Sequence, residues 1–416
     1  MNILKSIGIE MTKYKIVKLG PKEVEIPEEW EVSKLSKTST KITDGTHDTP
    51  ETISNGKKFI TGKHVEDGKI LFDQCLFISK EDHIDNISRC KPEIDDILFT
   101  HIGSIGKVAL IKKNIEFSIK NVALIKVNDK NVSNYVEYVL RSNYFRNQIH
   151  FITQGGVQNF IGLSTLRGMK IFIPPLPEQH RIAQILSTVD EAIEKTDEII
   201  KETKRLKKGL MQDLLTKGIG HTEFKKVKLG PKEVEIPVVW ELKKIKQVCE
   251  NLDRKRIPVT STDRTPGNIP YYGATGIIDY VDDYIFDETL VLVGEDGADW
   301  SSFGGTAFVV RGKSWVNNHA HVLRPVNINE IFLAEFLSMW DLQYAIVGTN
   351  RGKLNKGDLM KIEIPYPPLP EQRRIANILS TVDEKIEQEQ KYKEELEQLK
   401  KGLMQDLLTG KIRVKL

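Results

Sequence analysis

An eleven-residue phrase, LKKGLMQDLLT, occurs twice in this chain of 416 residues, at 206–216 and again at 399–409. The match extends upstream without insertion, so that Pro177 of PLPEQHRIAQILSTVDE aligns with Pro370 of PLPEQRRIANILSTVDE. A second repeat, KLGPKEVEIPEEW at 18–30, returns as KLGPKEVEIPVVW at 228–240, an offset of 210 residues against 193 for the first repeat. Self-similarity of this kind identifies a tandem duplication. The block between the repeats differs in sequence and is 17 residues shorter in the second half.

The longer repeated segments predict two long helices. Apolar residues recur every three or four positions, which indicates one apolar stripe along each helix. Pro177 and Pro370, each followed by Glu-Gln, suit a first helical turn. A helix of about 38 residues, roughly 57 Å long, needs a partner for its stripe, so we expect an antiparallel coiled coil with one variable block at each end. The stripe includes Ile182, Leu186, Val189, Leu206 and Leu210, and in the second copy Ile375, Leu379, Val382, Leu399 and Leu403.

Each copy of the phrase carries a glycine, Gly209 or Gly402, near the end of its predicted helix. An internal glycine costs a helix about 1 kcal/mol, but it lets another backbone approach. Two interpretations remain open, a bent or frayed helix end and a close helix crossing. Strict identity of the phrase exceeds what packing requires, because volume-conserving exchanges are tolerated in a plain seam. A surface that docks the same partner twice explains the identity better.

The two variable blocks predict compact domains with a shared plan. Strand-like runs such as KKFITG, NVALIKV and TLVLVG are broken by Gly, Asn and Asp turns, and helices are expected at about Val132–Gln148 and over INEIFLAEFLSMWD. The fold class is therefore α+β: two globular α/β domains separated by two long antiparallel helices, with pseudo-twofold symmetry. The expected boundaries are a lead-in at 1–17, a first domain at 18–176, a central helix at 177–217, a second domain at 218–369 and a C-terminal helix at 370–416.

Bulk composition excludes several classes of protein. The chain has 61 Lys and Arg residues against 58 Asp and Glu residues, a net charge of +3. This charge is too small to indicate nucleic-acid binding by itself. The cysteines Cys75, Cys90 and Cys249 show no metal-ligand spacing, which fits a reduced cytoplasmic protein. No apolar run is long enough for a membrane span, and no signal peptide is evident. We expect a soluble, cytoplasmic chain with no membrane partner and no cofactor of its own.

Several motifs that resemble chemical sites have simpler explanations. AFVVRGKS at 307–314 fits a lenient phosphate-loop pattern, but a strand follows it where a helix is required, so we expect a hairpin turn. IGSIGK at 102–107 lacks dinucleotide-binding spacing. His319 and His321 alternate on a predicted strand and could bind a metal together, yet no third ligand is in view. EDGAD at 295–299 fits either a metal loop or an ordinary acidic turn, and the turn is favoured. We therefore predict no metal site and no catalytic constellation in this chain.

Polar loops in each block carry side chains that read base edges. Gln and Asn pair with adenine, Arg pairs with guanine, and glycines let backbone amides approach phosphates. Such loops are also ordinary turn chemistry. The candidate DNA-contacting residues are Thr46, His47, Gln154, Gln158 and Asn159 in the first block, and Asn318, His319, Arg351, Lys353 and Asn355 in the second.

Nearly the whole chain resembles the specificity subunit of Type I restriction-modification enzymes. The resemblance is carried by IPxxW at 26–30 and 236–240, by PPLPEQ with RIAxILSTVDE, by KKGLMQDLLTG, and by DGTHDTP at 44–50. It implies two target recognition domains that read a bipartite, asymmetric site on double-stranded DNA, with domain centres about one DNA turn, roughly 34 Å, apart. It also implies two methylation subunits that use S-adenosylmethionine, and restriction subunits that translocate and cleave DNA with ATP and Mg.

In that setting LKKGLMQDLLT becomes a docking surface present in two copies, one for each methylation subunit. Two departures limit the DNA role of this chain: neither helix is basic, and the net charge is weak. We therefore expect poor DNA binding without partners. A coiled-coil adaptor with two protein-binding domains is the alternative function, and a freestanding nuclease or methyltransferase is disfavoured by the missing motifs.

Overall fold

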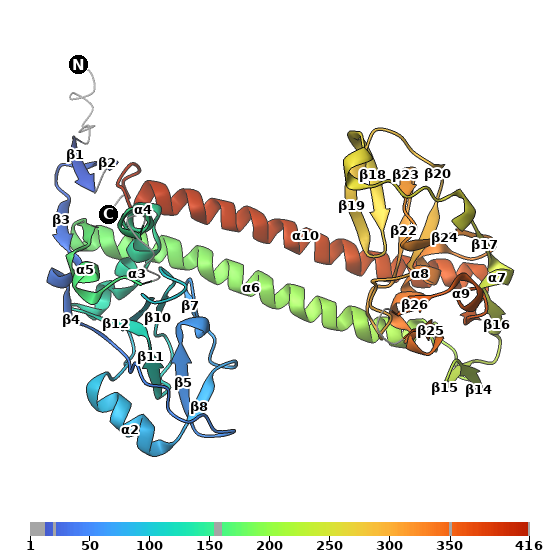
Figure 1. Cartoon of the computed structure of the whole chain (residues 1–416), viewed down its shortest axis with the longest axis horizontal. Coiled ribbons are helices and arrows are strands. Elements are labelled where there is room, and N and C mark those ends of the chain that lie inside the picture. Colours follow the sequence, from blue (N-terminus) through green and yellow to red (C-terminus); the bar gives the residue numbers. More distant parts are fainter. Residues whose placement is uncertain (1–12, 20–21, 154–159, 349–351, 415–416) are drawn as a thin grey trace. The chain divides into compact units, whose positions relative to one another are not determined.

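The computed structural model describes residues 13–19, 22–153, 160–348 and 352–414 of the chain. These residues form two compact units (Figure 1). Unit 1 comprises Met1–Lys195 together with Lys393–Leu416, and unit 2 comprises Thr196–Tyr392. The two long helices, α6 (Leu176–Leu214) and α10 (Leu369–Leu407), are continuous, and each contributes one part to unit 1 and the other to unit 2. Both predicted helices are present and each begins one residue before the expected start, but α6 ends at Leu214 rather than at 217 and α10 ends at Leu407 rather than at 416.

Unit 1 is built on two small sheets. The first is antiparallel, with the order β10 (Val108–Leu110), β9 (Ile97–Thr100), β12 (Val122–Val127) and β4 (Ser39–Asp44). The second has the order β11 (Phe117–Lys120), β5 (Lys57–Thr61) and β8 (Leu76–Ile78), with β11 parallel to β5. Among the described residues of unit 1, the other α-helices are α2 (Lys80–Arg89), α3 (Ser133–Arg141), α4 (Asn143–Thr153) and α5 (Leu163–Gly168).

Unit 2 repeats the first sheet in the same order with different sequences: β22 (Ala307–Val310), β21 (Leu290–Gly294), β24 (Ala320–Pro325) and β17 (Cys249–Asn251). A second sheet has the order β19 (Gly276–Val281), β18 (Pro266–Gly273), β23 (Lys313–Val316) and β20 (Phe286–Asp287), with β18 parallel to β23. The remaining helices are α7 (Ile245–Val248), α8 (Glu330–Met339) and α9 (Lys356–Leu359). Strands β21 and β24 therefore correspond to β9 and β12.

The repeated lead-in forms the same hairpin in both units. It consists of β1 (Tyr14–Leu19) with β2 (Lys22–Pro27), and of β14 (Phe224–Leu229) with β15 (Lys232–Pro237). Each hairpin is followed by a short strand, β3 (Glu31–Lys34) or β16 (Glu241–Lys244). That strand pairs with the strand entering the long helix, β13 (Lys170–Ile173) or β27 (Glu363–Tyr366).

The motifs that define the repeat meet inside each unit. Trp30 and Trp240 are fully buried, and their indole nitrogens donate to Glu178 and Glu371, the glutamates of the two PLPEQ segments. The neighbouring Gln179 donates its side-chain amide to the carbonyl of Pro174, which satisfies a buried backbone group at the start of α6. These contacts tie the lead-in of each unit to the helix that leaves it.

Parts of both long helices pack together within each unit. In unit 1, Ile182 and Leu186 of α6 share a core with Leu407 of α10, and Asp190 pairs with Lys400. Unit 2 has the equivalent ion pair in the opposite sense, because Lys207 of α6 pairs with Asp383 of α10. Within each unit the early part of one helix thus contacts the late part of the other, as antiparallel packing requires.

The predicted apolar stripe is only partly buried. Ile182, Leu186, Ile375 and Leu379 are fully buried, and Val189, Val382, Leu210 and Leu403 are half-buried. Leu206 and Leu399 are wrongly placed in the packed stripe, since they are 57% and 51% exposed. The helix turns them away from the core because, among the described residues, Lys207 and Lys400 beside them carry the inward ion pairs. Their spacing alone did not reveal this.

Gly209 and Gly402 lie inside continuous helices. A Cβ atom at either position would meet nothing within 4 Å among the described residues. The interpretation as a close helix crossing is therefore wrong within this chain, and both glycines sit on open helix surface.

Two local predictions also need correction. The helix expected at about Val132–Gln148 is two helices, because Ser142 adopts an extended conformation and its hydroxyl accepts the Phe145 amide, starting α4 as a new helix. AFVVRGKS does not form a hairpin, because β22 and the start of β23, which it contains, belong to different sheets. Within the described part of the chain, none of the helices combines the length and apolarity needed to span a membrane.

Candidate functional site

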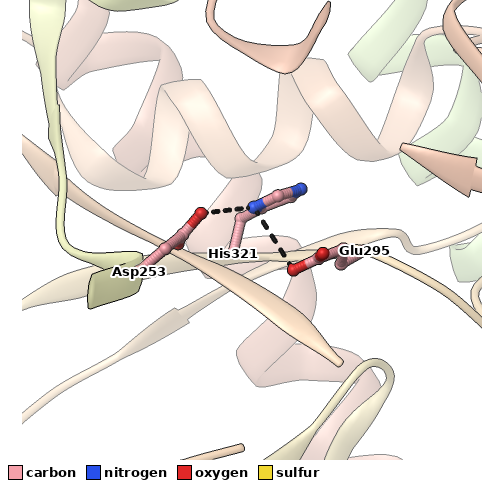
Figure 2. Close-up of side chains that lie close together, drawn as sticks. All are labelled: Asp253, Glu295 and His321. Atoms are coloured by element: carbon pink, nitrogen blue, oxygen red, sulfur yellow. Dashed lines mark hydrogen bonds and ion pairs between the residues drawn. The ribbon is translucent and has the colours of Figure 1, made fainter. Parts of the chain in front are cut away.

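A cluster of ionisable side chains lies at the end of the first sheet in unit 2 (Figure 2). Its centre is His321 on β24, whose side chain is 1% exposed. Nδ1 of His321 lies 2.7 Å from Asp253, which follows β17, and 3.6 Å from Glu295, which follows β21. Nε2 lies 2.7 Å from the carbonyl oxygen of Leu354. Three other segments of the chain therefore converge on the imidazole that β24 carries.

Cations balance the two carboxylates. Arg256 contacts Glu295 at 2.5 Å and Asp253 at 3.8 Å, and Lys353 contacts Glu295 at 2.8 Å. Burial acts to raise the pKa of Glu295, but hydrogen bonds from Lys353 and Arg256 outweigh it and hold the pKa below its usual value. Burial likewise opposes ionisation of Asp253, whose pKa is lowered by hydrogen bonds from His321 and from the Val322 amide. Both acids are therefore ionised at neutral pH.

The donor set of the cluster resembles a metal site, since ligand atoms of Asp253, Glu295 and His321 lie within 4.8 Å of one another. The expectation that His321 has no partners for a metal was therefore too narrow. A metal ion would need a lone pair on the imidazole, however, and both ring nitrogens already face oxygen acceptors. With Arg256 and Lys353 also on the carboxylates, the cluster is a closed network of ion pairs.

Unit 1 places a related arrangement at the corresponding position. Asp44 ends β4, and His101 follows β9 by one residue, as Glu295 follows β21. The ring nitrogen Nδ1 of His101 lies 3.0 Å from the carbonyl oxygen of Ile161, and Nε2 lies 4.0 Å from Asp44. Burial lowers the pKa of His101 against the opposing effects of Ile161 and Asp44. Its imidazole is therefore neutral at pH 7.

Ile161 and Leu354 occupy equivalent places in the two units. The Ile161 amide donates to the carbonyl of His101, and the Leu354 amide donates to the carbonyl of Glu295. The preceding residues form matching bridges, Phe160 with Ile102 and Lys353 with Asp296. In both units a buried histidine therefore contacts the carbonyl oxygen of this equivalent residue. The histidine follows β9 in unit 1, whereas in unit 2 it lies on β24, which corresponds to β12.

The candidate base-contacting residues flank these histidine sites. Thr46 and His47 follow Asp44, and His47 contacts Asp44 at 3.0 Å and Asn121 at 2.9 Å. Gly45 has no room for a side chain, because a Cβ there would lie 1.9 Å from the Ile119 carbonyl oxygen. The sequence DGTH is thereby fixed as a tight turn that leaves the His47 side chain exposed.

In unit 2 the candidates lie on the segments that meet at His321. Asn318 and His319 are exposed in the turn before β24 rather than on a strand, and His319 contacts Asp296 at 2.5 Å. Asn355 is exposed directly after Leu354, whereas the ammonium of Lys353 is engaged by Glu295. Four candidates, Gln154, Gln158, Asn159 and Arg351, lie outside the described residues.

Sequence reasoning missed the residues that hold these turns. Asp253, Arg256 and Glu295 are all distant from His321 in the chain, and only strand pairing brings them to it. Arg256 also donates to the carbonyls of Asn318 and Ala320, so it orients the turn that carries Asn318 and His319. One pattern in the sequence could have identified such positions: a charged residue or a histidine directly after a buried strand.

The described residues offer no reactive thiol. The three cysteines are free and buried. Burial raises the pKa of Cys90 to about 11 and that of Cys249 to about 12, so both are protonated and poorly nucleophilic at neutral pH.

Comparison with known proteins agrees with this architecture. A family model described as the type I restriction modification DNA specificity domain matches residues 27–205 and 237–398. The putative type I restriction enzyme MjaX specificity subunit of Methanocaldococcus jannaschii is 31% identical, covering 94% of this chain and 95% of that protein. The MjaVIII specificity subunit of the same organism is 27% identical and covers 94% of each chain.

Solved structures share the fold at low sequence identity. The crystal structure of a type I restriction-modification S subunit from M. genitalium has a TM-score of 0.59 and 17% identity, covering 94% of this chain and 98% of that one. A chain from a study of assembly and conformational transition of the type I system has a TM-score of 0.54 and 17% identity, covering 93% and 99%. The tandem arrangement of two mixed helix-and-strand domains is thus a property shared with these subunits.

Two matched copies of the specificity domain and full-length similarity at 31% identity lead to one conclusion. The chain belongs to the Type I restriction-modification DNA specificity family, whose members are the non-catalytic DNA-recognition components of restriction-modification complexes.

Proposed function

We propose that this chain reads a bipartite, asymmetric site on double-stranded DNA, with the turns of each unit contacting one half-site. The observation that carries the proposal is the identical order of the first sheet in the two units, combined with unrelated polar turns at its strand ends. A shared scaffold with different turns gives two recognition surfaces of the same geometry and different chemistry. Thr46, His47, Asn318, His319, Lys353 and Asn355 are the described candidates for base contact.

The two long helices act as the spacer between half-sites and as the docking surface for two methylation subunits. Support comes from the repeated phrase LKKGLMQDLLT, whose lysines Lys207 and Lys400 pair inward while Leu206 and Leu399 are exposed. Gly209 and Gly402 add open helix surface beside these leucines. An exposed leucine and an open glycine repeated in both copies form an apolar surface that a partner can bury.

Catalysis belongs to the partner chains in this proposal. The methylation subunits supply S-adenosylmethionine chemistry, and the restriction subunits supply translocation and cleavage with ATP and Mg. Because the net charge of this chain is only +3, it contributes few phosphate contacts, and the partners close around the duplex to provide the rest.

Exchange of one recognition block tests the division of labour. Residues 31–172 are replaced by the equivalent block of a relative with a different target, and the methylated sequence is determined in cells that express a methylation subunit. The proposal predicts that one half-site changes while the other half-site and the spacing stay the same. A change in both halves, or in neither, would overturn the assignment of one unit to each half-site.

A further inference from the structure

We infer that His101 and His321 are positioning residues, each of which fixes the turns of its recognition unit by hydrogen bonding to the carbonyl of Ile161 or Leu354. The inference rests on the proposed function, since the positioned turns are the ones that carry the candidate base contacts. It adds two residues that do not themselves reach DNA, because their side chains are 5% and 1% exposed.

The connection in unit 2 runs through both ring nitrogens of His321. Asp253 lies 2.7 Å from Nδ1, and the Leu354 carbonyl oxygen lies 2.7 Å from Nε2 and accepts a hydrogen bond from it. Asp253 also accepts the amide of Val322, at 2.8 Å. The imidazole therefore joins the segment after β17 to the short strand β26 (Lys353–Leu354), which Asn355 follows, and it can do so only as long as both bonds are made.

Charged groups surround His321. Asp253 and Glu295 face its Nδ1, and Arg256 and Lys353 hold the two carboxylates in place. The exposed candidates Asn318, His319 and Asn355 lie within three residues of His321 or Leu354 in the sequence. A shift of the imidazole would therefore displace them directly.

The connection in unit 1 uses the other ring nitrogen. His101 binds both polar backbone groups of Ile161, since its carbonyl accepts the Ile161 amide and its Nδ1 donates to the Ile161 carbonyl at 3.0 Å. Nε2 is buried and has no hydrogen-bond partner among the described residues. It faces Asp44, whose own partners are His47 at 3.0 Å and Arg89 at 3.9 Å.

This difference between the units permits a test with opposite outcomes. The side-chain amide of asparagine replaces the Nδ1 donor of histidine, and that of glutamine replaces the Nε2 donor. His101→Asn and His321→Gln therefore keep the bond to the carbonyl, whereas His101→Gln and His321→Asn lose it. Each replacement loses the hydrogen bond at one histidine and keeps it at the other, so each serves once as variant and once as control. The effect of removing the ring is thereby separated from the effect of losing the hydrogen bond to the carbonyl.

The first readout is amide hydrogen exchange of the full-length chain. Losing one hydrogen bond of about 1 kcal/mol speeds exchange about fivefold. We expect this at Leu354 in His321→Asn and at Ile161 in His101→Gln, with wild-type exchange in the two retaining variants. Equal exchange in the asparagine and glutamine variants of either position would overturn the inference, whatever the chain does on DNA.

The second readout is half-site discrimination in cells that express a methylation subunit. His321→Asn is expected to relax the half-site read by unit 2 by about tenfold, the effect of about 1.4 kcal/mol, and to leave the other half-site unchanged. His101→Gln is expected to relax the half-site read by unit 1 and to leave the half-site read by unit 2 unchanged. If exchange responds as expected but the wild-type chain directs no bipartite methylation, the proposed function fails and the positioning role stands. If wild-type methylation is specific and every variant matches it, the positioning role in recognition is wrong.

Discussion

The indole nitrogen of Trp30 lies 3.0 Å from a carboxylate oxygen of Glu178, a residue 148 positions later in the chain. Trp240 and Glu371 repeat the contact at the same distance in unit 2. Each glutamate has a second cationic or polar partner, Arg413 at 2.7 Å in unit 1 and His221 at 2.8 Å in unit 2. The motifs IPxxW and PLPEQ therefore encode one buried junction between a recognition block and its helix.

Replacing either tryptophan by phenylalanine tests that junction. Trp30→Phe and Trp240→Phe keep most of the buried ring but remove a hydrogen bond to a charged acceptor, so each should lower the free energy of unfolding by about 1.5–3 kcal/mol. Denaturant unfolding measures the loss. Trp315→Phe is the control, because the indole of this half-buried residue donates to a neutral carbonyl, that of Ile257. Equal losses in all three variants would argue against a special role for the two glutamates.

The inward lysine of the repeated phrase makes a second prediction. Lys207 lies 2.9 Å from Glu335 and 2.8 Å from Asp383, and burial raises the pKa of Glu335 despite this lysine. Lys207→Met leaves the buried carboxylate of Glu335 without its cationic partner. The variant should therefore lower the free energy of unfolding of unit 2 by about 3 kcal/mol at pH 7. The loss should shrink as the pH falls, because the folded state then protonates Glu335 more readily than the unfolded state does.

Two further variants separate this effect from loss of side-chain packing. The double variant Lys207→Met with Glu335→Leu should recover most of the stability, and Lys204→Met, on the exposed face of the same helix, should change it by less than about 0.5 kcal/mol. A Lys207→Met protein whose stability is independent of pH between 7 and 5 would contradict the explanation.

Buried histidines predict that unit 1 loses stability in mild acid. Burial lowers the pKa of His64, His83 and His101 below the ordinary value near 6.5. As the pH falls below 6.5 the unfolded chain takes up protons that the folded chain refuses, so stability decreases down to the folded-state pKa values. His101→Asn should flatten the decrease between pH 7 and 5.5 in denaturant unfolding. An unchanged slope in this variant would mean that His101 binds protons equally in the folded and unfolded chain, which would contradict a lowered pKa in the folded state.

The outward leucines predict the stoichiometry of the complex. Leu206→Lys or Leu399→Lys should reduce binding from two methylation subunits to one, and the double variant should bind none, because each change places a charge in an apolar docking surface. Mass measurement of the assembled complex reads the result. Val239→Lys, an equally exposed apolar position outside the helices, is the matched control. Unfolding should be unaffected, and two bound subunits in the double variant would exclude this docking surface.

Repetition in the sequence predicted the helices closely, because an apolar period and a proline start are local signals. The exposure of Leu206 was not predicted. The spacing of apolar residues cannot show that the neighbouring Lys207 faces the other helix to pair with Asp383, which leaves Leu206 on the solvent side. The break at Ser142 was missed because a serine fits both a helix interior and a cap. Asp253 was missed at the candidate site because its partner His321 is brought to it only by the pairing of β17, β24 and β21.

The most direct test of the account is single-molecule sequencing of methylated DNA from cells that express this chain together with a cognate methylation subunit, compared with cells that express the methylation subunit alone. The account predicts a new methylated motif in two parts, asymmetric and with a fixed gap, that is present only when this chain is expressed. A stable complex of the two chains that adds no such motif would contradict DNA recognition by this chain and favour an adaptor of two protein-binding domains.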